Sequence, residues 1–114
     1  KTTPVLLEVN ISKEEQKHGF WPDKIDDMIL CTTLKNISVK GLMTLGPRSK
    51  DEKETRRAFS LLRKIKDKIN YELGDNQLID LSMGMSADYE IGIEEGSTMV
   101  RIGTALFGPR SPLK

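Results

Sequence analysis

Hydrophobic and polar residues follow two different spacings along the chain. Four segments are rich in apolar and β-branched residues with a period of two, which is typical of strands. These segments span about residues 5–12, 39–45, 77–84 and 98–106. Between them, apolar residues recur every three or four positions, as in amphipathic helices. The helical segments cover about 23–34, a long stretch that follows Ser49–Glu52, and 87–95. The predicted order is therefore β-α-β-α-β-α-β.

The long helical segment has recognisable signals at both ends. Ser49–Glu52 has the Ser-x-x-Glu form of a capping box, and Gly74 is placed to end the helix. Its apolar stripe consists of Ala58, Leu62, Ile65, Ile69 and Leu73. The basic run RRAFSLLRKIKDK is interrupted by Asp67 and lacks the interleaved aromatic residues of a single-strand binder. We therefore interpret these cations as a solvated helix face and expect no nucleic-acid binding.

Helix-sized connections between strands favour a parallel sheet with right-handed crossovers. Four such strands fit either a small open α/β fold or half of a (β/α)8 barrel. In both architectures, ligands bind at the carboxyl ends of the strands. The ends of the third and fourth strands, MGMSAD and RIGTALFG, are therefore the predicted binding edge.

Composition narrows the class of protein. The chain has 114 residues, of which 37% are hydrophobic and 31% are charged, as expected of one small domain. The 18 Lys and Arg residues nearly balance 17 Asp and Glu, so no charge excess favours nucleic acid or an anionic membrane. No apolar stretch approaches the roughly 20 residues of a membrane span, and no signal-like start is visible. Cys31, the only cysteine, lies in the apolar run MILC, so we expect a buried thiol and a cytoplasmic protein.

Arg101 is an anomaly in the fourth predicted strand. Alternation places it on the opposite face from Val100 and Ile102, which is the other covered face of the predicted sheet. A buried guanidinium needs a partner because it does not lose its proton. That partner is either Glu8, which faces the same way on the first strand, or an acceptor atom of a ligand. The pattern alone leaves both alternatives open.

Small and hydroxyl residues at the same edge suggest phosphate binding. Gly103 permits close backbone approach, and the Thr104 hydroxyl can donate to an anion. Ser86 precedes the helical segment 87–95, where a ligand oxygen would meet unpaired backbone N–H groups. Taken alone, Ser86 is better explained as the N-cap of that helix, with Asp88 in its first turn.

Five blocks of the sequence resemble a known family. VLLEVNIS, EEQKHGF, GLMTLGP, LSMGMSADYE and GSTMVRIGTALFG occur in the order found in the pyridoxal 5'-phosphate (PLP) homeostasis proteins of the YggS or PROSC type. The resemblance covers nearly the whole chain and corresponds to the carboxyl-terminal half of that family. It implies that residues 1–114 form a parallel (βα)4 segment of a (β/α)8 TIM barrel similar to the N-terminal domain of alanine racemase.

The same resemblance implies roles for individual residues. PLP would lie at the strand carboxyl ends, with Ser86, Gly103 and Thr104 binding the phosphate and Arg101 facing the pyridine nitrogen. Three further residues fall in family motifs near the pocket: Asn10, Met43 and Ser82. Residues 17–19 also match a motif. We interpret His18 and Trp21 as loop residues, since no metal-ligand partners accompany them in the sequence.

Two departures from the family pattern bear on the site. The Schiff-base lysine of the family lies in the amino-terminal half of the barrel, so covalent attachment of PLP is not expected here. Glu8 stands where relatives commonly have an uncharged Gln, which maintains the Glu8–Arg101 ion pair as an alternative.

An arginine beside the pyridine nitrogen keeps the ring unprotonated, which argues against transaminase-like chemistry but is compatible with racemisation. We find no second acid or base placed for a racemase. The resemblance therefore implies a non-catalytic protein that stores PLP and delivers it to PLP-dependent apo-enzymes. The alternatives are an enzyme of the alanine racemase type and a half-barrel that binds nothing alone.

Half of a barrel would leave two open strand edges and an apolar interior, both of which invite pairing. We therefore expect the chain to self-associate or to pair with an amino-terminal half.

Overall fold

The computed structural model describes residues 2–14, 18–47, 51–85 and 88–101, with only the backbone described for Val100 and Arg101. Its elements are β1 (Thr3–Glu8), α1 (Ile25–Cys31), β2 (Ile37–Met43), α2 (Glu52–Leu73), β3 (Asp80–Met85), α3 (Tyr89–Glu94) and β4 (Met99–Arg101). The predicted order of strands and helices is confirmed.

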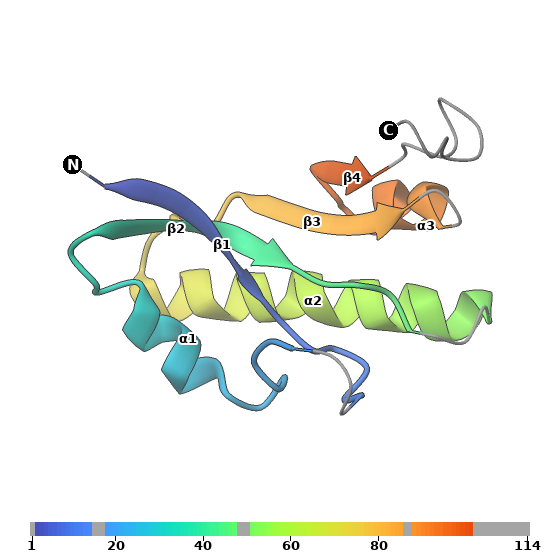
Figure 1. The fold of residues 1–114 in the computed structure, drawn as a ribbon, viewed down its shortest axis with the longest axis horizontal. Coiled ribbons are helices and arrows are strands. Elements are labelled where there is room, and N and C mark those ends of the chain that lie inside the picture. The colour runs from blue at the N-terminus through green and yellow to red at the C-terminus, as the bar shows by residue number, and fades with distance from the viewer. Residues whose placement is uncertain (1, 15–17, 48–50, 86–87, 102–114) are drawn as a thin grey trace, which may run out of the picture.

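The strands form one parallel sheet in the order β1-β2-β3-β4. Each pair of neighbouring strands is joined by a helix, as the lengths of the connections predict. Helix α2 runs along one face of the sheet, and both α1 and α3 contact α2 (Figure 1). Among these helices, none has the length and apolar character needed to cross a membrane.

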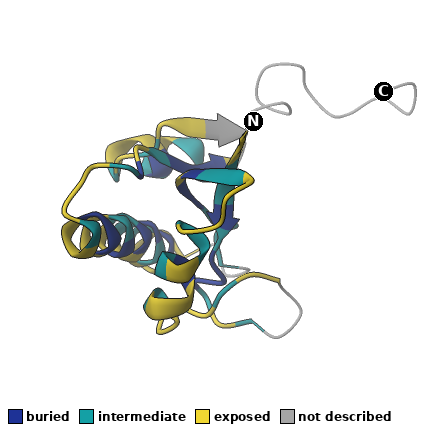
Figure 2. Ribbon diagram, turned by 90° about the vertical axis from the view of Figure 1, so that its left-hand side faces the viewer, coloured by how far each residue is buried: buried dark blue, intermediate teal, exposed yellow. Residues whose placement is uncertain are grey.

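The core lies between α2 and the strands. Its fully buried side chains include Phe59 and Leu62 from α2, Leu42 from β2, and Leu81 from β3. Figure 2 shows buried residues on the side of α2 that faces the sheet and exposed residues on its outer side. The predicted stripe is confirmed at Leu62, Ile65 and Ile69, while Ala58 and Leu73 pack at its margin. Phe59, which the sequence pattern did not single out, completes the stripe.

Gly41 allows β2 and β3 to approach each other closely. It is the register partner of Asp80, and a Cβ atom added to Gly41 would lie only 1.9 Å from the Asp80 carbonyl oxygen. The pairing of β1 with β2 is irregular next to this position, between Val5 and Leu6. A side chain at position 41 would therefore force the two strands apart.

The predicted strand boundaries are partly wrong. β1 ends at Glu8 rather than near residue 12, because Val9 forms an isolated bridge with Phe20 and the chain then turns. β3 begins at Asp80 rather than at residue 77. The preceding backbone is held instead by the Asn70 side chain, which donates to the Leu78 carbonyl and accepts from the Leu78 N–H, both at 2.9 Å.

The predicted C-terminal end of α2 is confirmed, whereas its predicted N-cap is wrong. Gly74 ends α2 in the left-handed conformation (φ 68°), as predicted, and its N–H donates to the Tyr71 carbonyl at 3.1 Å. The predicted N-cap Ser49 is wrong, because α2 begins at Glu52 and its cap is Asp51. The Asp51 carboxylate accepts from the Lys53 N–H at 2.9 Å.

Replacing Phe59 with Ala tests the importance of the α2 contact. The ring is fully buried, so we expect the free energy of unfolding to fall by about 3–5 kcal/mol through lost burial and a residual cavity. Leu61→Ala is the matched control, since Leu61 is 40% exposed on the same helix and should cost no more than about 1 kcal/mol. Urea denaturation measures both variants, and equal losses would contradict this account of the core.

Candidate functional site

One row of residues runs in register across the four strands, from the carboxyl ends of β1 and β2 to the third residue of β3 and the first residue of β4. Glu8 pairs with Met43, Met43 with Ser82, and Ser82 with Met99. Neighbours of this row, such as Leu42 and Leu81, are buried against α2. Because successive side chains of a strand point to opposite faces, the row lies on the face away from α2. Two predicted site residues, Met43 and Ser82, therefore lie side by side on this face.

Asn10 lies just beyond the carboxyl end of β1 and is buried. Its side-chain Nδ2 donates to the Glu14 carbonyl at 2.7 Å, and its Oδ1 accepts from the Glu14 N–H at 3.1 Å. Its backbone N–H donates to the Phe20 carbonyl at 2.7 Å. These contacts order the loop after β1. The structure thus places Asn10 just beyond the carboxyl end of β1, while its role toward a ligand stays a prediction.

Thr44 is a buried polar residue that the sequence analysis missed. Its hydroxyl donates to the Val9 carbonyl at 2.7 Å, and its backbone N–H donates to the Ser82 carbonyl at 3.0 Å. Thr44 therefore connects the segment just after β1 with the end of β2 and with Ser82 inside β3. Its position in the motif GLMTLGP, as a hydroxyl residue at the end of an apolar run, was the available signal.

The end of β3 is joined to the start of α3 by Asp88. Its carboxylate accepts from the Met85 N–H at 2.7 Å, and its own N–H donates to the Met85 carbonyl at 3.0 Å. The segment after β2 lies against this turn, because a Cβ added to Gly46 would lie 2.9 Å from the Asp88 carboxylate. The N-cap position of α3 is Asp88, so the prediction that Ser86 caps this helix is wrong.

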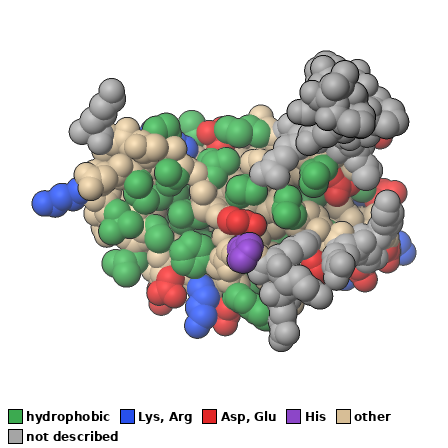
Figure 3. Space-filling model, in the orientation of Figure 1, with side chains coloured by type: hydrophobic (Ala, Val, Ile, Leu, Met, Phe, Trp, Pro, Cys, Tyr) green, Lys and Arg blue, Asp and Glu red, His purple; other side chains and the backbone are tan. Residues whose placement is uncertain are grey.

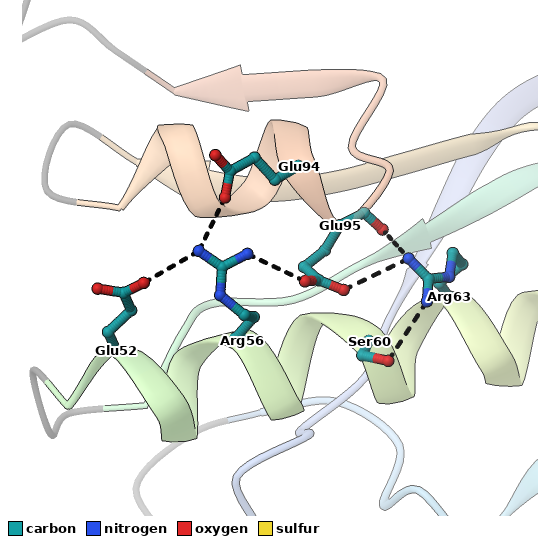
Figure 4. A network of polar contacts seen from close by, with 6 residues as sticks. All are labelled: Glu52, Arg56, Ser60, Arg63, Glu94 and Glu95. Atoms are coloured by element: carbon teal, nitrogen blue, oxygen red, sulfur yellow. Dashed lines mark hydrogen bonds and ion pairs between the residues drawn. The ribbon is translucent and has the colours of Figure 1, made fainter.

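Helix α3 is attached to α2 by a polar network centred on Glu95 (Figure 4). The Glu95 carboxylate accepts from Arg56 at 3.2 Å and from Arg63 at 3.4 Å. Arg56 also contacts Glu52 at 3.0 Å and Glu94 at 2.7 Å. These bonds, led by that to Glu52, hold the pKa of the Arg56 guanidinium above its ordinary value, so Arg56 stays charged.

Arg101 lies at the predicted edge as far as its backbone is concerned. It pairs with Met85 at the carboxyl end of β4. The Arg101 side chain lies outside the described residues, as do Lys17, Ser86, Gly103 and Thr104. The choice between Glu8 and a ligand as the partner of Arg101 therefore stays open.

The remaining candidates behave as ordinary loop or packing residues. His18 is exposed, and Trp21 is 42% exposed. Cys31 is a free thiol that is half-buried and packs against the core, so the expectation of full burial is only partly met. Across the described ranges, no three His, Cys, Asp or Glu side chains are grouped to bind a metal ion.

A separate hollow of about 700 Å³ lies between the last turns of α2 and residues 74–79, which lead into β3. It is at the amino-terminal end of β3, at the opposite end of the strand from Met85. This hollow is not part of the predicted edge.

Comparison with known proteins identifies the family of the chain. A family model described as the alanine racemase N-terminal domain matches residues 1–111. The chain is 45% identical over 107 residues to the pyridoxal phosphate homeostasis protein of Aquifex aeolicus, and 38% identical over 110 residues to that of Schizosaccharomyces pombe. The alignments cover 93% of this chain in both cases.

Solved structures give the same result. A protein of unknown function from Bifidobacterium adolescentis is 47% identical, with a TM-score of 0.86 over 93% of this chain. PipY of Synechococcus elongatus, solved with PLP bound, is 28% identical, with a TM-score of 0.79 over 95% of this chain. The matched regions make up 43% and 50% of those two structures, and 46% of the Aquifex protein. The chain thus spans about half the length of its relatives, and it belongs to the alanine racemase N-terminal domain family.

Proposed function

We propose that this chain binds pyridoxal 5'-phosphate and takes part in PLP homeostasis, storing and delivering the cofactor without catalysis. The observation that carries the proposal is a set of three buried polar residues along neighbouring parallel strands: Asn10 follows β1, Thr44 follows β2, and Ser82 lies within β3, where its carbonyl accepts from the Thr44 N–H. Ligands of parallel α/β folds bind at this edge. Relatives named for PLP homeostasis and the PLP-bound PipY structure identify the ligand class.

The pairing of β3 with β4 supports a phosphate site between their ends. Met85 and Arg101 are register partners, so the last described residues of β3 and β4 lie side by side. Ser86 directly follows Met85, while Gly103 and Thr104 come two and three residues after Arg101. Hydroxyl groups and backbone N–H groups from these positions would bind the phosphate. The proposed donors therefore follow two paired strands in the sequence.

The residues present fit PLP as a bound cofactor better than as a catalytic one. PLP supplies an aldehyde and an electron-withdrawing ring, and its reactivity depends on protonation of the ring nitrogen. Arg101 beside that nitrogen would donate a hydrogen bond and leave the ring unprotonated, because guanidinium keeps its own proton. The Schiff-base lysine would come from outside this chain. We therefore infer that this chain binds PLP non-covalently. We also infer that PLP-dependent apo-enzymes receive the cofactor and that the protein is cytoplasmic.

We also infer that the chain is the carboxyl-terminal half of a (β/α)8 barrel. Parallel sheets are normally covered on both faces, whereas here the described helices pack on one. The other face presents Met43, with Met99 44% exposed. The edges β1 and β4 have no further strand within the described sheet. A second set of strands, from an amino-terminal half or from another copy, would cover the exposed face and pair with the two edge strands.

Titration with PLP, followed by visible circular dichroism, tests the cofactor proposal. Free PLP gives no induced band, so a saturable band would place it in an ordered chiral site. We expect this band in the unmodified chain and its loss in Arg101→Ala. Lys40→Ala is the control, because Lys40 is an exposed cation on β2 and should leave the band unchanged.

Two outcomes of the titration would contradict the proposal, one for PLP binding and one for the role of Arg101. A well-folded chain without any induced band would mean that these residues do not bind PLP alone. A band that survives in Arg101→Ala would exclude the proposed role of that arginine. Racemisation of alanine by the PLP-loaded chain would instead favour an enzyme of the racemase type.

Sedimentation velocity tests the open edges. We expect self-association that weakens on dilution and in Met99→Lys, which places a charge on the row facing away from α2. Tyr71→Lys is the control, since Tyr71 is 82% exposed on α2. The face drawn in Figure 3 also carries several groups of hydrophobic side chains. A dilution-stable monomer would rule out the inferred pairing.

A further inference from the structure

Helix α3 depends on tertiary contacts for its stability. It has six residues, and isolated helices shorter than about 12 residues are marginal in water. One contact is with β3, because Gly92 lies so close that an added Cβ would be 2.6 Å from the Met83 carbonyl oxygen. The other contact is with α2, through Glu95. Together with packing against β4, these contacts hold α3 in place.

Glu95 is the central residue of the contact with α2. Its side chain is only 15% exposed and lies between Arg56 and Arg63. Arg63 also donates to the Glu95 backbone carbonyl at 2.8 Å, at the end of α3 where carbonyls lack helical partners. The bonds from Arg56 to Glu52 and Glu94 involve carboxylates that are 68% and 61% exposed, so they add little.

The opposite end of α3 is joined to the proposed phosphate site. Asp88 holds the Met85 N–H, and Met85 is paired with Arg101. A shift of α3 relative to α2 would therefore move the end of β3 at Met85. A continuous chain of contacts runs from Arg56 and Arg63, through Glu95 and α3, to this turn.

We propose that Glu95, held by Arg56 and Arg63, is a positioning residue for binding the phosphate group of PLP. Glu95 acts through α3 and need not touch the cofactor. This role rests on the proposed function and deepens it. It gives a function to the contacts of Glu95 with Arg63 and Arg56, which lie 32 and 39 positions away in the sequence. It predicts that the contact matters for phosphate-bearing ligands and not for the pyridine ring.

The test compares PLP with pyridoxal, which lacks the phosphate, in binding titrations of the unmodified chain and of Glu95→Ala. We expect the variant to bind PLP about tenfold more weakly, which corresponds to the loss of one charge-assisted hydrogen bond between the displaced site and the phosphate. The affinity for pyridoxal should be unchanged. Glu72→Ala is the matched control, because Glu72 pairs with Lys68 on the exposed side of α2 at 3.7 Å. It should bind both ligands normally.

Hydrogen exchange provides a second readout that needs no ligand. The N–H groups of Glu95, Gly96 and Ser97 donate to carbonyls within or just before the end of α3. Their exchange should accelerate in Glu95→Ala and remain unchanged in Glu72→Ala. If Glu95→Ala does not fold, Glu95→Gln carries the test, since it keeps the size and an acceptor while removing the charge, and it should lose PLP affinity in the same pattern.

Each contrary result has a distinct meaning. PLP binding that is unchanged in a Glu95 variant with faster exchange, or equal losses for PLP and pyridoxal, overturns the positioning role and leaves the proposed function intact. Absence of PLP binding by the folded unmodified chain contradicts the proposed function and, with it, this role. Unchanged exchange in Glu95→Ala overturns the claim that Glu95 secures α3.

Discussion

The packing of α2 against one face of the parallel sheet is the interaction on which the rest of the structure depends. Phe59 and Leu62 fill the space over Leu42 and Leu81, and all four side chains are buried. This contact decides which face of each strand is apolar and covered. It consequently sends Met43 and Ser82 to the other face, where the candidate site lies.

The candidate edge combines strand geometry with contacts made outside the strands. Thr44, which follows β2, links the backbone of Val9 after β1 to that of Ser82 within β3. Asp88 then joins the end of β3 to α3, and Glu95 joins α3 back to α2. The edge is therefore supported from two sides, by the sheet itself and by the helix pair behind it. This arrangement is the basis of the positioning role proposed for Glu95.

Much of the architecture could be predicted because it depends on local patterns. Alternation of apolar residues predicted four strands, the spacing of Leu62, Ile65 and Ile69 predicted the buried face of α2, and Gly74 predicted its end. The start of α2 was misplaced because Asp51 and Ser49 are both good caps, and only the path of the chain selects between them.

The features that escaped prediction depend on contacts between distant residues. The requirement for Gly41 arises from the carbonyl of Asp80 on the next strand. Arg56 resembled any other cation of a solvated helix, and only the position of α3 brings Glu95 to it. For the site, Met43 and Ser82 are register partners and Asn10 follows β1, but their roles toward a ligand stay predictions. Thr44 was missed because its hydroxyl bonds to a backbone carbonyl of a distant segment, that of Val9. Ser86, Arg101, Gly103 and Thr104 stay predictions as ligand contacts.

The most direct measurement is a map of backbone amide chemical shifts of the isotopically labelled chain as PLP is added. The account predicts that the perturbed amides cluster at the carboxyl ends of the strands, around Thr44, Met85, Asp88 and Arg101. Amides around the hollow at the other end of β3, such as those of Asn76 and Leu78, should stay unperturbed. Shifts centred on that hollow, or no saturable shifts at all in the folded chain, would contradict the claim that this edge binds PLP.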